Sequence, residues 1–154
     1  MDGGFLIETV VKPSSIPNAG RGRFFINNHK KDTIIRKQII GSDNLHCIKN
    51  KEGLDKYDID FLKHFGHTKP KHSEIETNYV YLNNPSMNTN HSLNNNIDYI
   101  YTNCEKITRL TRDVKAGEEM LQNYCNFTKN EWFEDFLHKA DMISARELGE
   151  HIST

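Results

Sequence analysis

Cysteine is scarce in this sequence: Cys47, Cys104 and Cys125 are the three cysteines among 154 residues, and they lie far apart. An odd, scattered set is typical of free thiols in a reducing compartment, not of a disulfide framework. Zinc modules built on cysteine need clustered pairs of ligands, and three isolated residues do not supply them.

Long apolar runs are also missing, and none is long enough to span a bilayer. Residues 1–5, Met-Asp-Gly-Gly-Phe, lack the basic start and the apolar stretch of a secretory signal. These absences predict an intracellular protein that is not held at a membrane, with the nucleus and the cytoplasm equally open.

An excess of charge of one sign is a third absence, because the formal net charge is -1 although 27% of the residues are charged. A near-neutral balance argues against direct binding to nucleic acid through bulk charge. It leaves room for a basic protein partner, such as a histone tail, which needs only a local acidic groove. The length suits one domain.

What is present predicts a mainly β fold with short helices. Short alternating or β-branched runs separated by turn signals predict strands, and they occupy residues 5–11, 23–26, 33–40, 46–48, 79–82, 97–102, 107–111 and 119–122. Helical spacing predicts a helix over residues 58–65, and residues 83–96 are too polar and too rich in asparagine for a regular element.

The tail changes to helical patterns. Thr128 and Glu131 are spaced as a capping box before a helix over residues 128–140, and Ser144 and Glu147 form a second capping box. The first helix carries an apolar stripe of Trp132, Phe133, Phe136 and Leu137. We therefore expect a domain over residues 1–127 with a helical extension over 128–154 packed on it, as a single unit.

Three segments carry motifs. Residues 20–24 read Gly-Arg-Gly-Arg-Phe, residues 90–96 read Asn-His-Ser-Leu-Asn-Asn-Asn, and residues 112–124 read Arg-Asp-Val-Lys-Ala-Gly-Glu-Glu-Met-Leu-Gln-Asn-Tyr. In this order they resemble the Gly-x-Gly, Asn-His-Ser-Cys-x-Pro-Asn and Arg-Asp-Ile-x-x-Gly-Glu-Glu-Leu-x-x-x-Tyr motifs of the SET family of lysine methyltransferases. The first motif alone is weak, and the order and spacing of all three carry the resemblance.

The resemblance covers most of residues 5–127 and implies a SET-domain, β-clip-like fold of small sheets. It also implies transfer of a methyl group from S-adenosyl-L-methionine to a protein lysine, with S-adenosyl-L-homocysteine as the product. The chain departs from the family pattern at Leu93, Asn95 and Gln122, where relatives have cysteine, proline and often an aromatic residue. It also lacks the zinc-binding flanks of many relatives, so we expect no metal.

By resemblance, Tyr124 is the catalytic tyrosine. A phenol with a pKa near 10 is protonated at pH 7, so we expect it to orient the amine and stabilise charge, not to act as a strong base. The resemblance implies contacts with the cofactor for seven residues: Arg21, Gly22, Arg23, Phe24, Asn88, Asn90 and His91. A further hypothesis comes from the expected tail helix, where Trp132 or Phe133 would lie against the cofactor or the channel, because a flat aromatic ring suits the adenine. Packing of the apolar stripe on the core is the alternative interpretation.

For the channel that admits the target lysine, Tyr99, Tyr81 and Gln122 are the candidates, and Tyr79 is a further one. An ordinary cross-strand aromatic residue is an equal interpretation of Tyr99. Five further residues are of types that bind zinc, but their spacing fits no compact zinc finger: His46, Cys47, His64, His67 and His72.

Two functions remain open at this point. The first is an active protein-lysine methyltransferase acting on a protein with an exposed lysine, including histone tails. The second is a catalytically inactive SET-fold module that binds partners through its surface, and methylation of a small molecule or of another side chain is a minor third. The sequence leaves a homodimer open and does not identify the substrate.

Overall fold

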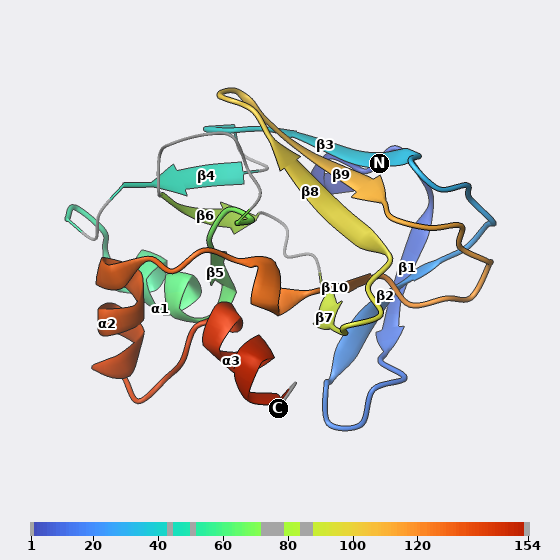
Figure 1. Ribbon diagram of the computed structural model, residues 1–154. Coiled ribbons are helices and arrows are strands. Elements are labelled where there is room, and N and C mark those ends of the chain that lie inside the picture. Colours follow the sequence, from blue (N-terminus) through green and yellow to red (C-terminus); the bar gives the residue numbers. More distant parts are fainter. Residues whose placement is uncertain (1, 43–44, 50–51, 72–78, 84–87, 153–154) are drawn as a thin grey trace.

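A computed structural model describes the chain except for residues 1, 43–44, 50–51, 72–78, 84–87 and 153–154. It consists of small β-sheets with short helices, so the expected mainly β fold is confirmed. Figure 1 shows the hairpin of β1 (Thr9–Pro13) and β2 (Arg21–Phe25) on one side and the helices α1 (Lys56–Phe65) and α2 (Glu131–His138) on the other.

The β1–β2 hairpin pairs Thr9 with Phe25 and Pro13 with Arg21. Its connecting loop turns through Asn18 and Gly20, both with positive φ, a conformation that asparagine and glycine tolerate best. The loop returns the chain to Arg21 at the start of β2, so the first motif lies at the edge of this sheet.

A three-stranded sheet forms the centre, in the order β3 (Ile34–Ile39), β9 (Glu105–Leu110) and β8 (Ile97–Tyr101). Alternate residues of β8 are buried, namely Ile97, Tyr99 and Tyr101, as expected for a strand with one face on the core. On β9 the buried positions include Lys106, a charged residue where the alternation calls for an apolar one.

A second three-stranded sheet has the order β4 (Leu45–Ile48), β6 (Val80–Asn83) and β5 (Gly66–His67). The helix α1 (Lys56–Phe65) leads directly into β5. A Cβ atom on Gly66 would lie 2.7 Å from the carbonyl oxygen of Leu62 and 2.8 Å from the Phe133 ring, so only glycine fits between these elements.

Two very short strands join the second and third motifs. β7 (Asn90–His91) pairs in parallel with β10 (Leu121–Gln122), and Tyr124–Asn126 follows as a 3-10 turn, η2. The side chain of Asn96 locks this crossing, because its Nδ2 donates to the Glu119 carbonyl over 2.8 Å and its Oδ1 accepts from the Leu121 N–H over 2.9 Å.

The tail forms α2 (Glu131–His138) and α3 (Ala145–Ile152). The predicted cap of α2 at Thr128 is wrong: Asn130 is the N-cap and accepts from the Phe133 N–H, so the helix is shorter than residues 128–140. The second capping box is confirmed, since Ser144 Oγ accepts from the Glu147 N–H over 3.2 Å.

The apolar core has two parts. One lies between the sheets and includes Phe25, Ile35, Tyr81 and Tyr101, and the other lies between α1, β6 and α2 and includes Leu62 and Phe133. The tail thereby packs on the β domain through its own apolar cluster.

Three sequence expectations need correction. Residues 2–4 form a 3-10 turn, η1 (Asp2–Gly4), and Phe5 forms an isolated bridge with Arg36, so the first strand starts only at Thr9. The strand expected over 119–122 is limited to Leu121–Gln122, and the polar segment 83–96 contains β7.

Within the described residues, no helix has the length and apolar character to cross a membrane.

Candidate functional site

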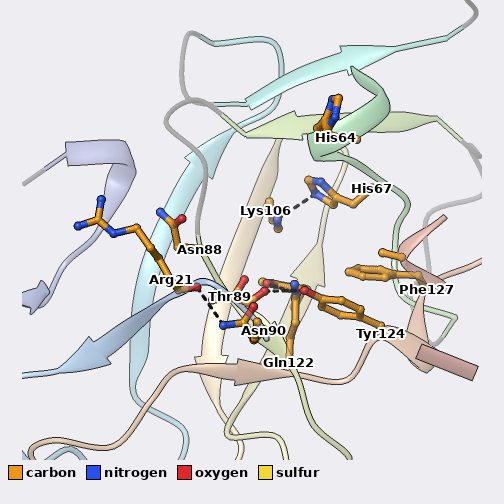
Figure 2. A pocket seen from close by; sticks show the side chains of 14 residues that line it. Arg21, His64, His67, Asn88, Thr89, Asn90, Lys106, Gln122, Tyr124 and Phe127 are labelled. Atoms are coloured by element: carbon orange, nitrogen blue, oxygen red, sulfur yellow. Dashed lines mark hydrogen bonds between the residues drawn. The ribbon is translucent and has the colours of Figure 1, made fainter. Parts of the chain in front are cut away.

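A cavity of about 360 Å³ opens where the two motif strands, β7 and β10, meet β8 and β9. Figure 2 shows the lining side chains, which come from segments far apart in the sequence. Six residues predicted as site residues line it: Arg21, Asn88, Asn90, Tyr99, Gln122 and Tyr124.

Tyr124 is held at the cavity by its hydroxyl group and its backbone. Its hydroxyl donates to the Thr89 carbonyl over 2.8 Å, and its N–H donates to His91 Nδ1 over 2.9 Å. The His91 and Tyr124 rings pack with centroids 5.1 Å apart. Burial raises the pKa of the Tyr124 hydroxyl, so the phenol is neutral at pH 7 and can act only as a hydrogen-bonding group.

Tyr99 and Gln122 form a second polar pair in the cavity. The Tyr99 hydroxyl donates to Gln122 Oε1, and burial raises the pKa of this phenol far above its ordinary value. Gln122 therefore has a specific hydrogen-bond partner on the cavity wall. The pairing gives Tyr99 a fixed hydroxyl position on the cavity wall.

Asn90 joins the first and third motifs. Its Nδ2 donates to the Arg21 carbonyl over 3.0 Å and to Glu119 Oε2 over 2.9 Å. Glu119 also accepts from the hydroxyl groups of Ser14 and Ser15. Burial raises the pKa of Glu119, but the hydrogen bonds from Asn90 and the serines outweigh it and hold the pKa below its ordinary value.

Gly22 is needed beside this carboxylate. A Cβ atom at Gly22 would lie 2.4 Å from Glu119 Oε2, and the Glu119 side chain is fixed by its hydrogen bonds. The second glycine of the first motif thus allows β2 to approach Glu119 closely. This role of Gly22 is structural, because the residue does not line the cavity.

Neither Gly22 nor His91 is among the residues that line the cavity, and four other predicted residues also lie away from this lining. Arg23 donates to Thr9 Oγ1 over 2.8 Å, and the buried ring of Phe24 carries Lys12 Nζ at 4.4 Å from its centroid. The Tyr81 ring is buried against that of Tyr101 with centroids 4.9 Å apart. These contacts place Arg23, Phe24 and Tyr81 in the packing of the domain.

Trp132 is the fourth residue. Its ring is partly buried, with centroids 5.9 Å from Phe133 and 6.5 Å from Phe136, in the apolar cluster of the tail. It is absent from the described lining of the cavity. Contact between Trp132 and a cofactor stays a prediction, and the packing here accounts for the apolar stripe without it.

The C-terminal helix reaches the site through another residue. A Cβ atom on Gly149 of α3 would lie 2.6 Å from Tyr124 Cβ and 3.0 Å from the Cys125 nitrogen. The helix backbone therefore lies directly against η2, and Ala145 of the same helix lines the cavity. The tail therefore contacts Tyr124 through Gly149 of α3, a residue that the sequence did not indicate.

The sequence also failed to predict Lys106 and His67 as site residues. Both are buried and line the cavity, with Lys106 Nζ 3.1 Å from His67 Nε2. The signal was the register of β9, which puts Lys106 on the buried face. Of the possible zinc ligands, His72 lies outside the described residues, and within those residues no three His, Cys, Asp or Glu side chains come together to hold a metal ion.

The comparisons with known proteins agree with this architecture. The chain matches no protein-family model and no curated protein sequence. Its backbone is similar to that of Chaetomium thermophilum Polycomb Repressive Complex 2 in a humanized mutant bound to an inhibitor, with a TM-score of 0.56, 21% identity, and coverage of 80% of this chain and 16% of that chain.

Two further structures of that complex match. The apo autoinhibited state gives a TM-score of 0.58 at 18% identity and covers 88% of this chain and 17% of that chain. A form bound to S-adenosylmethionine gives a TM-score of 0.54 at 17% identity and covers 88% of this chain and 17% of that chain. The chain has a SET-like fold. It spans only 16–17% of the length of these chains, so the likeness concerns the fold alone.

Proposed function

We propose that this SET-like protein is a protein-lysine N-methyltransferase that uses S-adenosylmethionine. The observation that carries the proposal is the convergence of the second and third motifs: the β7–β10 pair brings Asn90, Gln122 and Tyr124 to one cavity. The residues of each motif alone would have little meaning, but their meeting at one cavity supports a common chemistry.

The lining residues suit the cofactor. The cavity volume of about 360 Å³ is within the ordinary range for small-molecule sites. Arg21 supplies a cation for a carboxylate, and Asn88 and Asn90 bring amide groups to the same cavity. When bound, S-adenosylmethionine supplies an electrophilic methyl group on a positively charged sulfur.

The residues of this chain would orient the acceptor amine. A lysine amine must be neutral to attack, and its ordinary pKa of about 10.4 leaves it protonated at pH 7. The neutral hydroxyl groups of Tyr99 and Tyr124, fixed by Gln122 and by the Thr89 carbonyl, would hold the amine in line with the methyl group. The target is a lysine on another protein, with basic segments such as histone tails as first candidates.

The direct test is calorimetry with S-adenosylmethionine, followed by transfer of a labelled methyl group to histones, peptide arrays and cell lysate. We expect binding and label on lysine. Binding without transfer to any acceptor would instead support the inactive SET-fold module. Absence of both binding and transfer would remove the enzyme proposal.

Replacing Asn90 by alanine tests the cofactor side of the cavity. The substitution removes the amide that bridges Arg21 and Glu119, and a lost hydrogen bond to a buried partner costs about 1–3 kcal/mol. We therefore expect weaker S-adenosylmethionine binding, by about 10-fold, together with a lower melting temperature. The control is Asn94→Ala, which removes an exposed side chain of the same segment. An unchanged dissociation constant in Asn90→Ala would show that the cofactor does not depend on this bridge.

A further inference from the structure

Lys106 is a buried amine inside the cavity. Its Nζ lies 3.1 Å from His67 Nε2 and 4.2 Å from the centroid of the Tyr99 ring, and the side chain is fully buried. His67 Nε2 is also 3.2 Å from the Tyr101 hydroxyl. Figure 2 shows Lys106 and His67 meeting at one end of the lining side chains, with Asn90, Gln122 and Tyr124 at the other.

The surroundings of Lys106 favour its neutral form. The groups that face it are Arg36 from β3, His67 from β5, and Tyr99 and Tyr101 from β8. Burial, and then the charge of Arg36, lower the pKa of Lys106 well below its ordinary value.

The neighbouring groups do not reverse this effect. Burial lowers the pKa of Arg36 only to about 10, so its guanidinium stays charged at pH 7 and repels a second cation. Burial raises the pKa values of Tyr99 and Tyr101, so neither phenol supplies a negative charge. The face of the Tyr99 ring attracts an ammonium group, which offsets part of the cost of burial.

We propose that Lys106 is a catalytic base, which takes the proton from the ammonium group of the target lysine. The proposal rests on the proposed function. The target ammonium gives one proton to Lys106 Nζ, and its nitrogen lone pair then forms the new C–N bond as the S–C bond of the methyl donor breaks. The electron pair of the S–C bond stays on sulfur, the positive charge passes to the methylated nitrogen of the target, and Lys106 returns its proton to water at the cavity. His67 is a positioning residue, which holds the amine of Lys106 through its Nε2 atom.

The first test compares the pH dependence of kcat for the whole protein and for Lys106→Met, at saturating S-adenosylmethionine and histone peptide. We expect Lys106→Met to be at least 10-fold slower than the parent at pH 7. Its rate should then rise about 10-fold per pH unit toward pH 10, because the target amine must lose its proton unaided. Lys115→Met, which changes an exposed lysine, is the matched control and should follow the parent profile.

The second test needs no turnover. A lysine in the unfolded chain keeps its proton up to a pKa of about 10.4, whereas Lys106 in the folded chain releases it at lower pH. Between these two values unfolding takes up a proton, so the parent gains stability as pH rises. Lys106→Met lacks this contribution. The difference in melting temperature, variant minus parent, should therefore be more positive at pH 6 than at pH 9.5.

The outcomes separate the two proposals. An active parent with a parallel kcat profile in Lys106→Met would overturn the base alone, and so would a melting difference independent of pH. Peptide mass spectrometry that found the methyl group on Lys106 itself would also overturn the base, because the residue would then be an acceptor. A parent that transfers no methyl group to any amine would instead remove the proposed function.

Discussion

Tyr124→Phe is expected to slow methyl transfer by about 100-fold or more, while the dissociation constant for S-adenosylmethionine changes by only a few-fold. The change removes one hydroxyl group and keeps the ring that packs on His91. The neutral phenol is fixed at the cavity by the Thr89 carbonyl, so the contribution that we expect from it is the orientation of the acceptor amine. Single-turnover rates and calorimetry measure the two quantities separately.

A structural effect of Tyr124→Phe must be measured beside the kinetic one. The lost hydrogen bond to Thr89 costs about 1 kcal/mol of stability, which lowers the melting temperature but leaves the protein folded at assay temperature. Tyr57→Phe, which changes a side chain that is 74% exposed, is the control for removal of a tyrosine hydroxyl group. A Tyr124→Phe protein with near-normal turnover would show that another group orients the amine.

Much of the β architecture could be predicted from local sequence patterns. The patterns at residues 33–40, 97–102 and 107–111 predicted strands, and these segments contain most of β3, β8 and β9. The predicted boundaries moved where tertiary contacts decide them, as in the strand expected over residues 5–11, which begins at Thr9 while Phe5 forms an isolated bridge with Arg36 of β3.

The parallel β7–β10 pair is different, because strands of this length have no periodicity of their own. Their pairing joins positions about thirty residues apart and depends on Asn96, whose amide bonds both the Glu119 carbonyl and the Leu121 N–H. The motif resemblance pointed to Asn90, Gln122 and Tyr124 separately. Only the structure brings them to one cavity and pairs Gln122 with Tyr99.

The residues that sequence reasoning missed break local rules. A lysine in a strand normally indicates a solvent-facing position, so Lys106 gave no sign of burial until the register of β9 was known. His67 was considered only as a possible zinc ligand, and its actual partners are Lys106 and the Tyr101 hydroxyl. An ionisable residue on a buried face is where a functional site and the general rules of folding come into conflict.

Gly149→Val is expected to damage the site from outside it. Gly149 of α3 is buried, and even a Cβ atom there would lie 2.6 Å from Tyr124 Cβ, which is far inside normal contact distance. The atoms that it would meet belong to the backbone and the Cβ of η2, so no flexible side chain can move aside. Either α3 moves away or η2 shifts together with Tyr124.

Both responses have measurable consequences. Overpacking of this kind costs about 1–3 kcal/mol of stability. A small displacement of Tyr124 from its position at the cavity is expected to lower kcat by about 10- to 100-fold. The loss should appear well below the melting temperature of the variant. Cofactor affinity should change less than kcat, because Arg21 and Asn90 lie on β2 and β7.

The control places the same side chain on the same helix without the contact. His151→Val puts a β-branched residue at an exposed position of α3, so it reports the effect of valine on this helix without a contact to Tyr124. Gly149→Val should therefore lose activity where His151→Val does not. A Gly149→Val protein that melts at lower temperature but turns over normally when folded would restrict α3 to a stabilising role. A loss of kcat in the folded variant would show that the tail helix sets the position of Tyr124, which would give this chain a support for its tyrosine that needs no zinc-binding flank.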